Sequence, residues 1–209
     1  MKETRQRILD TARELFNAQG LHRVGVRDVA RAAEMSAGNL AYHFPTKDDL
    51  VAALIIELHE LNQRTIFAAL PQKFTLVTLY LAAVAAMRNM LGYRFVLLSY
   101  VDAVVASPQL QAFEAELACK RRERHQHMLE ALIQGGYVEA RARTRSDIIY
   151  EQGMMISSGW LANAALRSMP DEVAVLHFAK LGCALLEPYC TPRGKRQLRQ
   201  IWKQAHDGG

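Results

Sequence analysis

Helical periodicity runs through almost the whole chain, and this feature constrains the fold more than any other. Ile8, Ala12, Leu15 and Phe16 recur at the spacing of one helix face, and Gly20 after them predicts a helix end. No stretch shows a sustained alternation of apolar and polar residues, so strands are not expected. The pattern therefore predicts an all-α protein.

Caps and helix breakers divide this pattern into separate helices. Ser36 is an N-cap signal, Thr46 and Asp49 have the spacing of a capping box, and Pro71 predicts the end of the helix that follows them. The predicted helices cover residues 3–19, 26–33, 37–44, a long stretch from 47 towards Pro71, and residues 74–90, 93–106, 108–134, 146–167, 171–187 and 192–205.

Two of these helices are short, and the tight turn between them makes a helix-turn-helix pattern. On the second short helix, helical spacing directs Leu40 and Phe44 to the core and places Gly38, Asn39 and Tyr42 on the other side. A packed bundle has no use for an outward face of this composition, so we favour DNA binding over a structural helical hairpin. The second helix of such a pair lies in the major groove.

The residue types on this face fit contacts with DNA. Asn39 has the donor and the acceptor that pair with adenine, and small residues before it let the backbone approach closely. Tyr42, His43 and Lys47 have polar groups that bind phosphates, and Arg27 suits a phosphate or a guanine. The predicted DNA-binding residues are Arg27, Ser36, Ala37, Gly38, Asn39, Tyr42, His43 and Lys47.

Residues 4–20 and 26–50 resemble the DNA-binding domain of the tetracycline-repressor (TetR) family. The resemblance is most specific in the run Ser-Ala-Gly-Asn-Leu-Ala-Tyr-His-Phe-Pro-Thr-Lys-Asp-Asp-Leu, which extends from Ser36 to Leu50. The sequence departs from the family pattern at Val24-Gly25, where hydroxyl residues are usual, and at Glu34, where a turn glycine is common. Ala41 replaces a frequent aromatic residue. The remainder of the chain resembles the family only in being all-helical.

The resemblance implies a three-helix helix-turn-helix domain at residues 1–50 and a helical bundle for effector binding and dimerisation at residues 51–209. It implies a ligand-responsive transcriptional regulator, acting as a repressor, whose homodimer binds a palindromic operator in double-stranded DNA and is released by a small molecule. The alternative is a TetR-like DNA-binding protein that a protein partner controls.

The middle helices are rich in methionine and aromatic residues, which fill a bundle core or line an adaptable pocket. The sequence leaves both interpretations open. Asp102, within an apolar helix, is either paired or exposed, or else it binds the polar end of a ligand. Because the family resemblance implies a pocket, the expected effector is small and apolar or aromatic. The candidate lining residues are Met87, Phe95, Leu98, Tyr100, Asp102, Met128, Met155 and Trp160.

Two apolar helices before Pro188 form the predicted dimer interface. Two helices from each subunit would make a four-helix bundle with twofold symmetry, and the small residues at 182–184 permit close approach. The candidate interface residues are Ile148, Ile149, Met155, Ile156, Leu176, Ala179, Gly182, Cys183 and Leu186.

Charge and composition narrow the class of protein further. The net charge is +5, but residues 1–50 hold eight Lys/Arg against seven Asp/Glu, so charge alone does not locate a DNA site. The basic run at 120–124 is predicted to be a solvated helix face, with phosphate binding as the alternative. Three cysteines without a C-x-x-C motif, the lack of a signal peptide and short apolar stretches predict a cytoplasmic protein that makes no membrane contact.

Sequence motifs give no support for an enzyme. The chain has no G-x-S-x-G, no H-E-x-x-H and no phosphate-binding loop, so neither catalysis nor a cofactor is expected. His125 and His127 stand two residues apart on a predicted helix and so do not face each other. No metal site is predicted.

Overall fold

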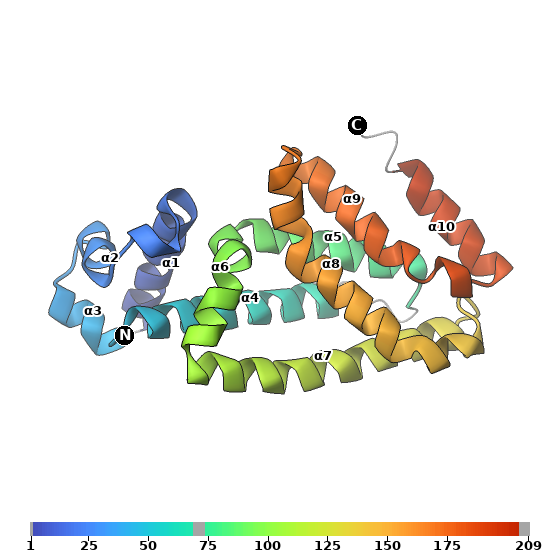
Figure 1. Cartoon of the computed structure of the whole chain (residues 1–209), viewed down its shortest axis with the longest axis horizontal. Helices are drawn as coiled ribbons and strands as arrows, with labels where there is room; N and C mark the ends of the chain where they lie inside the picture. Colours follow the sequence, from blue (N-terminus) through green and yellow to red (C-terminus); the bar gives the residue numbers. More distant parts are fainter. Residues whose placement is uncertain (1, 69–73, 205–209) are drawn as a thin grey trace. The chain divides into compact units, whose positions relative to one another are not determined.

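The computed structural model describes residues 2–68 and 74–204 of the chain, and helices make up most of them (Figure 1). Pro71 and Ala205, which belonged to predicted helix ends, lie outside the described residues. Within the described ranges there is no strand, only an isolated antiparallel bridge between Val138 and Cys190. The prediction of an all-α fold is confirmed.

The helices follow the sequence pattern closely. They are α1 (Lys2–Gln19), α2 (Val26–Ala32), α3 (Ala37–His43), α4 (Lys47–Ala68), α5 (Leu76–Leu91), α6 (Arg94–Ala106), α7 (Pro108–Gln134), α8 (Ser146–Leu166), α9 (Asp171–Ala184) and α10 (Pro192–Gln204), with the 3₁₀ turns η1 (Leu21–Arg23), η2 (Ala140–Arg145) and η3 (Glu187–Tyr189). The predicted helix 171–187 is too long, because the chain leaves α9 at Leu185 and tightens into η3, which has a proline in its first positions.

The chain forms two compact units, and three helices run from one into the other. The first unit is Met1–Leu61 with Asn89–Glu114, and the second is Asn62–Arg88 with Ala115–Gly209. The division falls inside α4, α5 and α7, and α6 belongs to the first unit. The first unit thus holds α6 and most of α4 together with α1, α2 and α3, and the functional boundary at residue 50 stays a prediction.

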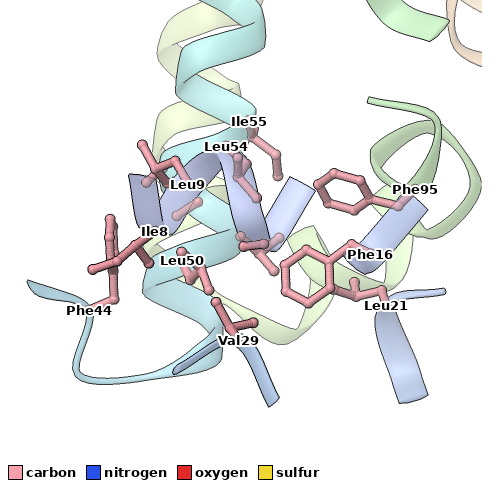
Figure 2. Packing of buried hydrophobic residues seen from close by; sticks show 14 of the residues in the cluster. Ile8, Leu9, Phe16, Leu21, Val29, Phe44, Leu50, Leu54, Ile55 and Phe95 are labelled. Atoms are coloured by element: carbon pink, nitrogen blue, oxygen red, sulfur yellow. The ribbon is translucent and has the colours of Figure 1, made fainter. Parts of the chain in front are cut away.

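The first unit has a continuous apolar core (Figure 2). Ile8, Phe16 and Leu54 are at most 1% exposed, and they come from α1 and α4. Phe95 of α6 joins them, with its ring centroid 5.2 Å from that of Phe16. The apolar stripe predicted on the first helix is thus buried, and α6 is part of the same core.

The second unit packs α8 beside α9 and carries α10 at its C-terminal end. Trp160 of α8 is 1% exposed, and its ring centroid lies 6.2 Å from that of Phe178 on α9. A Cβ at Gly194 would lie 2.1 Å from the carbonyl oxygen of Tyr137, so only glycine lets α10 approach this turn so closely. No helix among the described residues combines the length and the apolar character needed to cross a bilayer.

Candidate nucleic-acid interface

α3 is a short helix with one exposed face and an opposite face that packs in the core. The Ser36 Oγ accepts a hydrogen bond from the Asn39 N–H at 3.1 Å, as the N-cap prediction requires. Leu40 and Phe44 are 0% and 2% exposed, which fixes the side of the helix that faces the core. Tyr42 is 75% exposed. The other exposed residues of this helix are Ala37, Gly38, Asn39 and Ala41.

His43, unlike Tyr42 beside it, is half-buried. Its ring meets that of Tyr42 edge-on, with 5.3 Å between the centroids. The Tyr42 side chain is otherwise exposed, and its role as a phosphate contact stays a prediction.

The turn between α2 and α3 is held by backbone hydrogen bonds. The Met35 N–H donates to the Ala30 carbonyl at 3.0 Å, and the Ala33 N–H donates to the Val29 carbonyl at 2.8 Å. Glu34 adopts φ 52°, the left-handed conformation that a glycine would adopt without strain. For a residue with a Cβ this costs about 1–2 kcal/mol, so packing of the two flanking helices must offset it.

The start of α2 is capped in a way that the sequence analysis did not predict. Gly25 has no side chain to cap the helix, but its own N–H donates to Asp28 Oδ2 at 2.9 Å. Arg31 also pairs with Asp28, at 3.6 Å. Arg27 is exposed in the first turn and has no ion pair among the described residues, so its guanidinium is open to DNA.

The predicted capping box at the start of α4 is confirmed. The Thr46 N–H donates to Asp49 Oδ2 at 3.0 Å, and the Asp49 N–H donates to Thr46 Oγ1 at 3.1 Å. Lys47, between them, is half-buried, and its Nζ donates to the Leu21 carbonyl at 2.5 Å. The Lys47 ammonium is thus tied to η1, and two of its three N–H groups remain for a phosphate.

Arg5 is a cation near α3 that the sequence analysis did not select. Its guanidinium carbon lies 4.9 Å from the centroid of the Phe44 ring, which follows the last residue of α3. Arg5 is exposed, so its charge adds to the positive charge beside the recognition helix. Local sequence gives no signal for this contact, because it joins residues far apart in the chain.

A half-buried polar network ties α1 to α4 and to the residue that precedes α6, and it too was not predicted. Arg13 Nη1 donates to Glu57 Oε1 at 3.0 Å and to the Tyr93 hydroxyl oxygen at 3.3 Å, while Gln6 Nε2 donates to Glu57 Oε2 at 3.0 Å. The Tyr93 hydroxyl donates to Glu57 as well. Burial, together with this hydrogen bond, raises the pKa of Tyr93 to about 12, so the hydroxyl stays neutral and keeps its proton.

Asn17, further along α1, joins that helix to the start of α6. Its Nδ2 donates to the Gly92 carbonyl at 2.7 Å, and its Oδ1 accepts from the Phe95 N–H at 3.2 Å. The start of α6 is thus held by the helix that supports the helix-turn-helix. Any displacement of α6 has to move α1 or break these bonds.

The predicted interface residues on α8 and α9 fall into two groups. Ile148 and Met155 are exposed. The chain's own core buries Ile149, Ala179, Cys183 and Leu186, while Ile156, Leu176 and Gly182 are half-buried. The exposed residues are open to a partner subunit, the half-buried ones are open in part, and the buried ones are not, because both sides of these helices are apolar.

The exposed side of α8 has a regular pattern that sequence analysis missed. Steps of four and three residues, the coiled-coil spacing, separate its members. They are Ile148, Gln152, Met155, Gly159, Ala162 and Leu166, all exposed. Ile148, Met155 and Leu166 are 49%, 74% and 87% exposed, which is unusual for a stripe of large apolar side chains. On α9, Val173 and Leu181 are also exposed.

The eight candidate pocket residues are not gathered in one unit. Phe95, Leu98 and Asp102 belong to the first unit, where Phe95 is in the core and the other two are exposed. The Asp102 carboxylate lies 3.9 Å from His22 Nε2. The side chain of Tyr100 lies outside the part of the chain that the structure describes.

The other four candidates belong to the second unit. Met87 and Trp160 are buried there, Met128 is half-buried, and Met155 is exposed on the stripe of α8. Residue type and spacing therefore did not distinguish core positions from surface positions in these helices, and the pocket lining itself stays a prediction.

A short exposed helix, capped and buttressed beside a second short helix and a tight turn, defines a helix-turn-helix DNA-binding protein. A family model described as bacterial regulatory proteins of the tetR family matches residues 8–54, and a second model, described as bacterial transcriptional repressor, matches residues 60–198. The chain belongs to the TetR family of transcriptional regulators.

Relatives agree with this assignment. The HTH-type transcriptional regulator UidR of Escherichia coli K12 is 37% identical over 57 residues, a match that covers 27% of this chain and 29% of UidR. The chain thus spans under a third of the length of such curated relatives. A TetR-family transcriptional regulator from Marinobacter aquaeolei VT8 superimposes with a TM-score of 0.84, at 19% identity, covering 96% of this chain and 98% of the other.

The structure is also similar to that of SmeT, the repressor of the Stenotrophomonas maltophilia multidrug efflux pump SmeDEF. The complex of SmeT with triclosan has a TM-score of 0.66 and 16% identity, covering 91% of this chain and 93% of SmeT. At these identities the two structural likenesses bear on the fold alone.

Proposed function

We propose that this chain is a dimeric repressor that binds a pseudo-palindromic operator in the cytoplasm and is released from it by a small-molecule effector. The observation that carries the proposal is the exposed face of α3, where Asn39 and Tyr42 stand clear of the core while Leu40 and Phe44 anchor the helix. Side chains so arranged read base edges and phosphates in the major groove.

Recognition by one such helix is limited to a few base pairs, so specific binding requires two half-sites. A twofold dimer would supply them, with half-sites about 34 Å or a multiple of that apart along the duplex. The apolar stripe of α8, with Val173 and Leu181 on α9, supports this dimer. Two helices from each subunit would then bury these side chains in a four-helix bundle.

The effector is assigned to the second unit. The triclosan complex of SmeT supports a small-molecule ligand for this fold. Release follows from linkage. A ligand that binds better to a conformation in which the two α3 helices of the dimer are wrongly spaced for DNA must lower the affinity for DNA. DNA lowers the affinity for the ligand by the same factor.

The first unit offers a route for this coupling. α4, α5 and α7 each continue from the second unit into the first, and the Arg13–Glu57–Tyr93 network joins α1 to α4 and to the start of α6. A change in the direction of these helices would therefore be transmitted to α1, which packs on the helix-turn-helix. The network thus adds the start of α6 to the route that α4 provides.

A mobility-shift titration at several salt concentrations tests the function. Fragments of the DNA upstream of the gene are compared with random DNA of equal length, and with the same fragments after one half-site has been scrambled. We expect preference for a fragment with two half-sites, and a loss of at least tenfold in affinity when one is scrambled. Equal affinity for every fragment would contradict the proposal.

A further inference from the structure

The basic run at residues 120–124 divides into two sets with opposite surroundings. Lys120 pairs with Glu116 at 2.5 Å, and Arg122 pairs with Asp147 at 2.7 Å and with Glu151 at 2.8 Å. These cations lie on the exposed side of α7 or at its edge, and acids neutralise them. The predicted solvated face is correct for this part of the run.

Arg124 lies on the side of α7 that the rest of the chain covers. Leu110, Leu117 and Arg124 recur every seven residues, so they lie close to one line along the helix. The two leucines are 1% and 2% exposed, and Arg124 is half-buried. Arg124 therefore places a guanidinium on a line of the helix whose two preceding positions hold buried leucines.

In the part of the chain that the structure describes, this guanidinium has no acceptor. Within residues 2–68 and 74–204, no hydrogen bond or ion pair to Arg124 is present, and the charged neighbour that acts on it is Arg121, of like sign. Burial is the main cause that lowers the pKa of Arg124, and the charge of Arg121 adds to it. The acids nearest in sequence on α8, Asp147 and Glu151, are engaged by Arg122.

The hydroxyl of Tyr150, on α8, is a second hydrogen-bond donor that lacks a good acceptor among the described residues. Tyr150 is 7% exposed, its ring centroid lies 5.6 Å from that of His125, the residue next to Arg124, and its hydroxyl makes only a long contact of 3.5 Å to the Ala118 carbonyl. A contact of this length is at the limit of a hydrogen bond. Two donors from α7 and α8 are therefore left without a good acceptor in the same neighbourhood.

We propose that Arg124 and the Tyr150 hydroxyl form the binding subsite for an oxyanion, a carboxylate or a phosphate group, carried by the effector. This inference rests on the proposed effector function of the second unit. Guanidinium and phenol donors match such an anion, and the charge-assisted bonds would offset the cost of keeping Arg124 partly desolvated. It adds a negative charge to the small apolar or aromatic effector that the sequence analysis expected.

The test combines thermal unfolding of the full chain with anion titration. The probes are sodium benzoate, sodium octanoate, inorganic phosphate and sulfate, each against sodium chloride of equal ionic strength, with benzamide and octanamide as neutral counterparts. We expect saturable stabilisation of the wild type by an anion of this set and none by its neutral counterpart. Organic acids acting without phosphate would assign a carboxylate; phosphate or sulfate acting alone would assign a phosphate group.

Arg124→Met and its control Lys120→Met each remove one positive charge from α7. We expect Arg124→Met to raise the melting temperature without anion by about 2 °C or more, because an unpaired, half-buried charge is removed. It should also weaken anion binding by about tenfold or more, while Lys120→Met binds as the wild type does. An unchanged anion response in Arg124→Met, a lower melting temperature of that variant, or no anion effect on the wild type would overturn the inference.

Operator binding is measured separately on the wild-type protein. An anion that binds through Arg124 without releasing DNA would leave the subsite in place and contradict the effector role in the proposed function. Failure of the protein to prefer any operator would contradict the DNA-binding proposal and leave the anion result unaffected.

Discussion

At the scale of single residues, Asn39 and Tyr42 are expected to act differently on DNA. Ser36 caps α3 by accepting a hydrogen bond from the backbone N–H of Asn39. Asn39→Ala therefore keeps the helix and removes only the amide side chain. We expect a loss of about 1–3 kcal/mol and a relaxed preference at one base step. Tyr42→Ala should weaken binding to all sequences alike, because a phosphate contact carries no base information.

The measurement is a set of affinities for operators substituted one base pair at a time. Gln126→Ala, an exposed change on α7 in the second unit, is the control for handling and concentration. If Asn39→Ala discriminates among the operator variants as the wild type does, Asn39 does not read a base.

The three cysteines are predicted to differ sharply in reactivity. Burial raises the pKa of Cys183 to about 12 and that of Cys190 to about 11, so at pH 8 both are protonated and unreactive, whereas Cys119 is exposed. Iodoacetamide should therefore modify Cys119 alone in the folded protein, and all three in denaturant, as mass spectrometry would show. Cys119→Ser should abolish labelling of the folded protein; labelling of Cys190 as fast as Cys119 would contradict this.

At the scale of helices, local signals could be predicted from the sequence and long-range ones could not. The Ser36 cap and the Thr46–Asp49 box are confirmed because each lies within four residues of chain. The packing of α6 on α1 could not be predicted, because its contacts join residues as distant as Asn17 and Phe95. No helical period records which distant helix a face will meet.

The polar network makes a prediction about stability. Glu57 accepts hydrogen bonds from Gln6, Arg13 and Tyr93. Glu57→Ala would leave the buried Tyr93 hydroxyl without this acceptor, while Arg13 keeps its ion pair with Asp10. We expect a loss of about 1–3 kcal/mol in the free energy of unfolding, measured by urea denaturation. Glu60→Ala, an exposed change on the same helix, should alter it by less than about 0.5 kcal/mol.

If the two variants unfold alike, the network contributes nothing net to stability. α1 would then be joined to α4 by the apolar core, and to α6 by Asn17 and the contact of Phe16 with Phe95.

At the scale of the whole molecule, the sequence predicts α8 and α9 as interface helices, and the structure adds which faces of these helices the chain's own core leaves open. Ile149 and Trp160 are buried while Ile148 and Met155 are exposed, so α8 is apolar on two sides. A hydrophobic pattern identifies helices that bury two faces, and only the packed chain reveals which face is left open.

Glycine positions on these two helices allow the dimer to be tested without disturbing the subunit. A Cβ added at Gly159 or Gly182 would meet no atom within 4 Å, so arginine fits the isolated chain at either position and has the higher helix propensity. In a four-helix bundle of two subunits, the same side chains would enter the closely packed interface and carry charge into it. We therefore expect Gly159→Arg and Gly182→Arg to sediment as folded monomers, while Gln126→Arg on α7 remains a dimer.

Loss of the dimer should also appear in DNA binding, because two linked recognition helices bind cooperatively through their effective concentration. Each monomeric variant is expected to bind the operator about 100-fold more weakly or worse, with its affinity for an isolated half-site unchanged. If both variants stay dimeric and bind the operator at full strength, the subunits associate through a surface other than the exposed stripe of α8 and its neighbours on α9.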